Sequence, residues 1–106
     1  DYPDCDKELT IVRAHVDGID ADLAEQICRF MAAARQQQLE KPPGVAETLD
    51  WARALVALHR HHLDPATVEE TLGLVFKDYH DVTQVKQSLA EFLESVGLRS
   101  ALTSTG

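Results

Sequence analysis

The sequence predicts an all-α fold, a bundle of about five helices. Nearly every hydrophobic residue recurs at intervals of three or four positions, the repeat of an amphipathic helix. No stretch alternates strictly between hydrophobic and polar residues, as a half-buried strand would. The 106 residues, 44% of them hydrophobic, suit one folded domain. We expect the helical domain to span residues 1–97 and residues 98–106, mostly small and polar, to form a flexible tail.

The first helix is predicted to open at Pro3 and Asp4. Acidic residues follow in its first turn, where the helix dipole favours negative charge, and Gly18 is expected to stop the helix. Its hydrophobic stripe comprises Cys5, Leu9, Val12 and Val16.

The second helix is predicted to begin after Asp20, which has the side chain of a typical N-cap. Its stripe comprises Leu23, Ile27, Phe30 and Ala34, with Met31 beside it. Three glutamines at 36–38 lie on its fraying end. A stiff connector follows at 41–44, because a residue that precedes proline is driven out of the helical region.

The third helix is predicted to start at Gly44. Glu47 stands where a capping box places its acid, although Gly44 has no side-chain oxygen to complete the box. The predicted core face comprises Val45, Leu49, Ala52, Leu55 and Val56, widened by Trp51 and Leu58. Trp51 is either a core residue or an exposed anchor for a partner, and its apolar neighbours favour the core. The helix is expected to run into the histidine-rich stretch 59–62 at its carbonyl end.

A fourth helix is predicted to begin at Asp64 and Pro65, an N-cap followed by proline in the first helical position. Its core residues are predicted to be Val68, Leu72 and Val75. The fifth helix keeps a spacing of three and four residues and is expected to end at Gly97. Its stripe comprises Val82, Val85, Leu89, Phe92 and Val96.

The charge of the chain excludes several classes of partner. Asp plus Glu number 18 and Lys plus Arg number 10, which gives a formal net charge of −8. Nucleic acid and anionic membrane surfaces are therefore not expected as partners, since both select clustered basic residues. No apolar run approaches the length of a membrane span, and no signal peptide is recognisable. A cytoplasmic location is expected.

Few residues suggest a catalytic or metal-binding site. Phosphate loops, nucleophile elbows and zinc-binding motifs are absent from the sequence, so no catalytic residue and no metal site is predicted. Cys5 and Cys28 are interpreted as small hydrophobic residues in a reducing compartment. His59 and His62 have a spacing that can chelate a transition metal, but a solvated helix end is the favoured interpretation. The acidic pairs at 69–70 and at Glu91 and Glu94 are interpreted as solvated faces.

Three segments resemble one protein family. The opening DYPDCDKELTIVRAHV resembles the first lid helix of AAA+ ATPases of the MoxR group, where a short YPD or FPD linker leads from the ATPase core into an acidic helix. KPPGVAETLDWARAL resembles a signature of one MoxR-like branch, and LDPATVEETLG resembles the helix start that follows it. Together the three segments cover residues 1 to about 74, and their common order is more specific than any one of them.

The resemblance implies that the chain is the C-terminal helical lid of a larger, chaperone-like ATPase. The first residue, Asp1 rather than Met, fits a piece of a longer protein. The absent core would bind ATP and Mg²⁺ and carry out hydrolysis, whereas the isolated chain is expected to hold no cofactor and to have no activity. The implied partners are that N-terminal core, neighbouring subunits of a ring, and a protein with a von Willebrand factor A domain.

The resemblance also suggests where nucleotide would lie. The late part of the first lid helix lines the adenine pocket in many AAA+ proteins, and here that part contains Ile11, Ala14 and His15. Packing for Ile11 and Ala14, and a surface position for His15, are equally open interpretations. The start of the third helix usually carries a sensor-2 arginine in a pattern like S-x-R. The matching positions here are Gly44 and Ala46, with Glu47 next, so the arginine is absent, and Arg53 lies too far along to replace it.

A different class of function stays open. The chain could be a free-standing helical module that docks a partner in an apolar groove. A Walker loop encoded upstream of Asp1 would favour the lid, and a start codon directly before Asp1 would favour the module. An enzyme built on the histidine group is remote.

Overall fold

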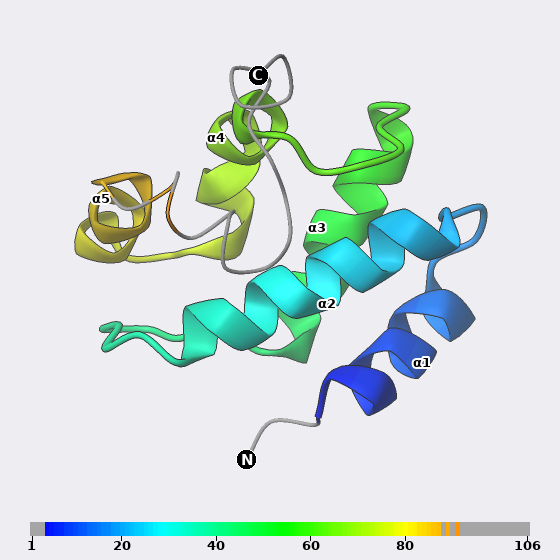
Figure 1. Cartoon of the computed structure of the whole chain (residues 1–106), viewed down its shortest axis with the longest axis horizontal. Coiled ribbons are helices and arrows are strands. Elements are labelled where there is room, and N and C mark those ends of the chain that lie inside the picture. The colour runs from blue at the N-terminus through cyan, green and yellow to red at the C-terminus, as the bar shows by residue number, and fades with distance from the viewer. Residues whose placement is uncertain (1–3, 88, 90, 92–106) are drawn as a thin grey trace.

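The computed structural model describes residues 4–87, 89 and 91, and this part of the chain contains helices and no strand (Figure 1). The prediction of an all-α bundle of about five helices is confirmed. The helices are α1 (Cys5–His15), α2 (Ala21–Arg35), α3 (Val45–Ala57), α4 (Pro65–Val75) and α5 (Tyr79–Gln87).

The longest helix, α2, lies across the middle of the bundle (Figure 1). Helix α1 packs against both α2 and α3, and α3 packs in turn against α2 and α4. Helix α5 packs against α4 at the opposite side of the molecule from α1 (Figure 1). Two segments far apart in sequence, α1 and the start of α3, thereby become neighbours.

Side-chain oxygens cap two of the helices, at Asp64 as predicted and at Asp4, which was expected only to complement the helix dipole. Pro3, the other predicted start residue of the first helix, lies outside the described residues. The Asp4 carboxylate accepts a hydrogen bond from the Lys7 N–H at 2.8 Å, and the Asp64 carboxylate accepts one from the Thr67 N–H at 2.7 Å. Each satisfies a backbone donor that has no partner within its helix. Asp20 lies at the N-cap of α2 as predicted, but its side chain makes no capping bond.

The core contains most of the predicted stripe residues. Trp51 is fully buried, which confirms the core interpretation of this residue. Its indole packs edge-on against Phe30, with ring centroids 5.1 Å apart, and donates a hydrogen bond from Nε1 to Thr71 Oγ1 at 2.8 Å. An aromatic side chain with its polar atom satisfied in this way can be buried without penalty. Other predicted core residues with no exposed area are Val12, Leu23, Ile27, Met31, Ala34, Ala52, Leu55, Val68, Leu72 and Val85.

The carbonyl end of α3 differs from the prediction. The helix ends at Ala57, so the histidines at 59–62 follow it instead of extending it. His59 has a φ of 58°, and the N–H groups of His59 and Arg60 bond the carbonyls of Val56 and Leu55 at 3.0 and 2.9 Å. This is a Schellman ending, in which a left-handed residue closes the last turn. Leu58, the cap residue, turns outward and is 51% exposed, so its predicted core position is wrong.

Smaller differences concern helix ends and partial burial. Helix α1 ends at His15, with Val16 extended, and Gly18 has its positive φ of 79° in the following turn. The three glutamines at 36–38 follow α2 instead of forming its last turn. Several predicted core residues are only half-buried: Cys5, Leu9, Val45, Leu49, Val56 and Val82. The predicted core residues Phe92 and Val96, the stop at Gly97 and the tail at 98–106 lie outside the described residues.

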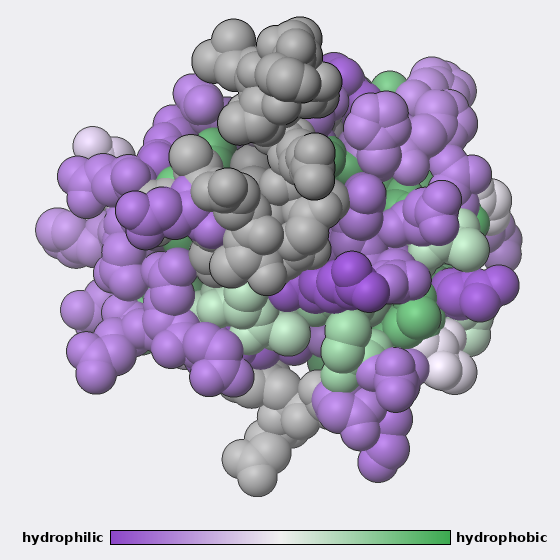
Figure 2. Space-filling view, viewed as in Figure 1, coloured by the Kyte–Doolittle hydropathy of each residue, from purple (hydrophilic) through white to green (hydrophobic). Residues whose placement is uncertain are grey.

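The surface is largely polar on the face drawn in Figure 2, where hydrophilic side chains surround small, separate hydrophobic areas outside the grey residues. The large hydrophobic residues that are exposed in the described part of the chain are Leu58, Leu74 and Tyr79. Within the described ranges, no helix combines the length and the hydropathy that crossing a membrane requires.

Candidate functional site

The residues expected at an adenine pocket lie on the second half of α1. Ala14 and His15 are exposed and Ile11 is half-buried. His15 is in the last turn, where the carbonyl end of the helix favours a cation. The structure therefore leaves this part of α1 accessible.

The two residues expected at the sensor-2 position lie in the first turn of α3. Ala46 is exposed. Glu47 is half-buried, and its Oε1 accepts a hydrogen bond from the Gly44 N–H at 2.7 Å. Because Gly44 has no side chain, this bond is the acid half of a capping box, as predicted. Arg53, further along α3, is exposed and pairs with Asp50 at 3.8 Å.

These two groups of residues lie at different distances from the contact between α1 and α3. The part of α1 that meets the start of α3 is its first half, through Glu8. His15 lies about two turns further on, roughly 10 Å along the helix axis. Ile11, by contrast, lies only about one turn, roughly 5 Å, beyond Glu8.

A buried polar cluster joins these elements. Arg35, the last residue of α2, donates from Nη1 to Glu8 Oε1 at 2.7 Å and from Nη2 to Glu8 Oε2 at 2.9 Å. The Thr48 hydroxyl donates to Glu8 Oε2 at 2.6 Å. The side chains of Arg35 and Glu8 are 6% and 1% exposed. We call Glu8, Arg35 and Thr48 the buried cluster.

The buried cluster also fixes the connector between α2 and α3. Arg35 Nε donates to the Pro43 carbonyl at 2.8 Å, so the planar guanidinium binds a carboxylate and the backbone at once. Burial of a charge is tolerated only when its hydrogen-bonding groups are satisfied, and this geometry meets that condition. The cluster thus links α1, the end of α2, the connector and the first turn of α3.

Sequence reasoning missed this cluster, although one signal was present. Glu8 was counted as an acid that complements the helix dipole. It stands four residues before Val12 and eight before Val16, both buried, and so belongs to the inward stripe of α1. An acid on a hydrophobic stripe requires a cationic partner, but its identity depends on the tertiary fold.

A second buried carboxylate holds the other part of the connector (residues 36–44). Asp81 of α5 is 1% exposed. Its two oxygens accept the N–H groups of Glu40 and Lys41 at 2.7 and 2.8 Å. No local pattern in the sequence marks this contact, because the partners are backbone groups about forty positions away.

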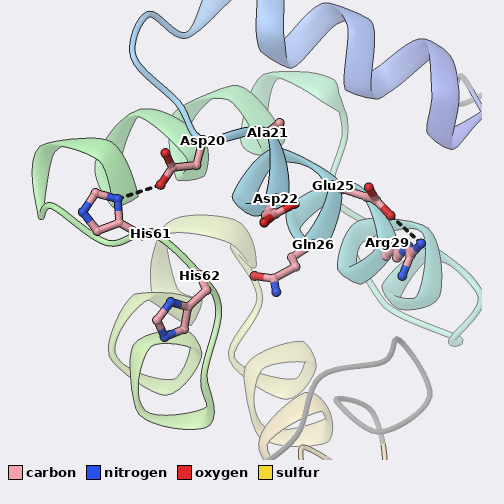
Figure 3. A pocket seen from close by; sticks show the side chains of 8 residues that line it. All are labelled: Asp20, Ala21, Asp22, Glu25, Gln26, Arg29, His61 and His62. Carbon is pink, nitrogen blue, oxygen red and sulfur yellow. Dashed lines mark hydrogen bonds and ion pairs between the residues drawn. The ribbon is translucent and has the colours of Figure 1, made fainter.

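A polar hollow of about 580 Å³ opens at the start of α2 (Figure 3). At one side of it the Asp20 carboxylate contacts His61, with Oδ2 and Nδ1 2.6 Å apart, which explains why Asp20 does not cap α2. Glu25 pairs with Arg29, and Gln26 Oε1 accepts the Leu63 N–H at 2.7 Å. We call this the acidic hollow, lined by Asp20, Ala21, Asp22, Glu25, Gln26, Arg29, His61 and His62.

The histidines do not form a metal centre with their neighbours. His62 lines the acidic hollow, whereas His59 occupies the left-handed position that ends α3. Among the residues that the structure describes, no group of three or more His, Cys, Asp or Glu side chains is placed to hold a metal ion. Glu69, Glu70 and Glu91 are exposed as predicted, and Glu94 lies outside the described residues.

The two thiols are poor nucleophiles. Burial raises the pKa of the Cys28 thiol to about 12, with a further contribution from the negative charge of Glu8. Burial also raises the pKa of Cys5, aided by the charge of Asp6. Because the thiolate is the reactive form, neither cysteine is suited to catalysis. Both are free, and Cys28 packs in the core, as its interpretation as a small hydrophobic residue predicts.

Comparison with known proteins found no matching protein family, no matching curated protein and no matching solved structure. The resemblance carried by the three sequence segments therefore stays a prediction, and its consequences for function are proposals.

Proposed function

We propose that this chain is the helical lid of a MoxR-like AAA+ ATPase. In this proposal the lid closes over ATP and Mg²⁺ bound by an ATPase core that is not part of these 106 residues, and it relays the nucleotide state to neighbouring subunits of a ring. The parent protein is an ATP hydrolase of the chaperone type, located in the cytoplasm, and a protein with a von Willebrand factor A domain is its expected partner.

One observation carries the proposal. Glu8 lies in the first segment that resembles the family and Thr48 lies in the second, and the two side chains are hydrogen-bonded at 2.6 Å although forty residues separate them. Two independent resemblances thus fall on parts of the chain that form one structural unit. The third segment also coincides with a structural feature, the start of α4, because its Asp64 caps that helix and its Pro65 occupies the first helical position.

The accessible half of α1 is the part of this unit available to nucleotide. Ala14 and His15 are exposed and Ile11 is half-buried, so adenine could pack against them without rearranging the core. Glu47 supplies no positive charge and is engaged by the Gly44 N–H. In the proposed lid, this position therefore supplies no positive charge to stabilise the γ-phosphate.

The proposal is tested first by the gene. The DNA upstream of the Asp1 codon should encode a phosphate-binding loop and a magnesium-binding acid. A start codon directly before Asp1 would contradict the lid and favour the free-standing interaction module.

The second test uses the intact ATPase. His15→Ala should weaken ATP binding at least about fivefold, which corresponds to about 1 kcal/mol, when affinity is measured by calorimetry. His80→Ala is the matched control, because His80 is an exposed histidine on another helix. Equal affinities of the two variants would remove α1 from the nucleotide site. The isolated 106-residue chain should show no ATP turnover.

A further inference from the structure

Residues 40–44 of the connector between α2 and α3 are held at both ends by charged side chains. At one end the Asp81 carboxylate of α5 binds the N–H groups of Glu40 and Lys41 at 2.7 and 2.8 Å. At the other end Arg35 binds the Pro43 carbonyl at 2.8 Å, and Glu47 binds the Gly44 N–H at 2.7 Å. The backbone polar groups here are thus satisfied mainly by side chains from other elements.

The segment between these two attachments is stiff. Pro42 and Pro43 fix their own φ angles near −65° and confine the residue before each of them to extended conformations. Neither has an N–H that could form an alternative bond. An extended segment of this length reaches roughly 9 Å, at about 3.1 Å per residue. A displacement at Lys41 is therefore transmitted to Gly44 instead of being absorbed by dihedral rotation.

Helix α5 lies at the edge of the described bundle, where it packs against α4, whereas α2 packs against both α1 and α3 (Figure 1). In the described part of the chain the buried hydrophobic residues of α5 are Val85 and, just beyond Gln87, Leu89. Asp81, on the same helix, is buried and binds the connector. The side-chain amides of Gln84 and Gln37 also join α5 to the connector, but their hydrogen bond is exposed. Elements at the edge of a structure, with few packed neighbours, open before its centre.

We infer that Asp81 is a latch through which α5 controls the start of α3. While α5 is docked, its carboxylate holds residues 40 and 41, and the proline segment (residues 41–44) holds Gly44 in place for the first turn of α3. When α5 opens, Glu40 and Lys41 lose their acceptor, and the proline segment carries the displacement to Gly44 and Thr48. This coupling is a property of the bundle itself and does not depend on its being a lid.

The test is amide hydrogen exchange on the 106-residue chain with Asp81→Asn. Asparagine offers one acceptor oxygen in place of two, and its NH₂ group faces a second N–H, so at least one of the two bonds is lost. Loss of a charge-assisted bond should accelerate exchange at Glu40 and Lys41 by about 10- to 100-fold. The latch further requires exchange at Gly44 and Thr48 to accelerate by at least about tenfold, while the amides of Ile27 and Cys28 in α2 keep their protection.

Asp78→Asn is the matched control. Asp78 caps the start of α5 by accepting the His80 N–H at 2.8 Å, and asparagine caps a helix equally well. This variant carries the same chemical change three positions away and should leave exchange at Gly44 and Thr48 as it is in the original chain. Acceleration confined to Glu40 and Lys41 in Asp81→Asn would overturn the latch, as would acceleration at Gly44 in both variants.

A measurement on the unsubstituted chain keeps the inference testable if Asp81→Asn does not fold. In low concentrations of denaturant, the amides of α5, Lys41, Gly44 and Thr48 should exchange through one opening with a shared denaturant dependence, before the amides of α2. Separate denaturant dependences for α5 and Gly44 would contradict the coupling.

Discussion

Two acid–base pairs join distant parts of this chain, and they differ in almost every physical respect. The Glu8–Arg35 pair is buried, bidentate and shared with Thr48 and the Pro43 carbonyl. The Asp20–His61 pair makes one contact of 2.6 Å between side chains that are 49% and 73% exposed. The first pair organises the backbone around it, whereas the second lies at the rim of a solvent-filled hollow.

The comparison illustrates how burial determines the stability that is lost when one partner of such a pair is removed. A buried charge that loses its partner is left without solvation, so removal of either partner of Glu8–Arg35 is costly. An exposed pair loses little because water replaces the partner. We therefore expect the buried cluster to stabilise the packing of α1 against α3. Residues that line the acidic hollow are expected to tolerate substitution with little loss of stability.

The largest expected effect is that of Arg35→Met. Methionine keeps much of the side-chain volume but leaves Glu8 as an unpaired buried charge, and we expect a loss of about 3–5 kcal/mol in the free energy of unfolding. Arg29→Met is the matched control on the same helix. Arg29 is 55% exposed, and its substitution should cost less than about 1 kcal/mol. Urea denaturation followed by circular dichroism measures both, and equal losses would refute the comparison.

A smaller effect is expected from Thr48→Val, which is nearly isosteric and removes the hydroxyl that bonds Glu8. Because that bond is to a buried carboxylate, the loss should be about 1–3 kcal/mol. Thr10→Val is its control, since the Thr10 hydroxyl bonds the Asp6 carbonyl on an exposed face of α1. The control should change stability by less than about 0.5 kcal/mol. Thermal unfolding of the two variants separates them, and similar melting temperatures would argue against a special role for Thr48.

At the carbonyl end of α3, His59→Gly should stabilise the chain. His59 is the non-glycine residue that has a positive φ, 58°, in the described part of the chain. A left-handed residue with a Cβ costs about 1–2 kcal/mol, whereas glycine costs about 0.5–1 kcal/mol of additional chain entropy, so a net gain of up to about 1.5 kcal/mol is expected. His62→Gly should instead destabilise, because it brings only the entropic cost. A loss of stability in His59→Gly, measured by urea denaturation, would contradict the assigned ending of α3.

The smallest effect is the coupling between Asp20 and His61. A double-mutant cycle with Asp20→Ala and His61→Ala should yield about 0.2–1 kcal/mol, and less in high salt. Unfolding measured at two ionic strengths provides these values. A coupling energy as large as that of the buried pair would remove the distinction on which the comparison depends.

Local patterns predicted the helices well, because helix starts and stripes depend on neighbouring residues. Asp64 followed by Pro65 located the start of α4, and the residues Leu23, Ile27, Phe30 and Ala34 correctly described the buried face of α2. Where the prediction was wrong, a local alternative existed. Leu58 fits the stripe of α3, but a left-handed residue at His59 ends the helix before Leu58 can turn inward.

The polar sites could not be predicted, because their partners meet only in the folded chain. Arg35 is 27 positions from Glu8, and Asp81 is about forty positions from the backbone groups that it binds. Hydrophobic periodicity carries no information about which charges pair across such separations. The residues expected to contact nucleotide, such as His15 and Glu47, came from a family resemblance, and their roles stay predictions.

The most direct test of the buried cluster is a double-mutant cycle of Glu8→Met and Arg35→Met, measured by urea denaturation. Each single variant leaves one buried charge unpaired, whereas the double variant replaces the pair by apolar side chains of similar size. We predict that the double variant recovers most of the stability lost by the singles, with a coupling energy above about 2 kcal/mol. Additive losses would show that Glu8 and Arg35 act independently and would contradict the account.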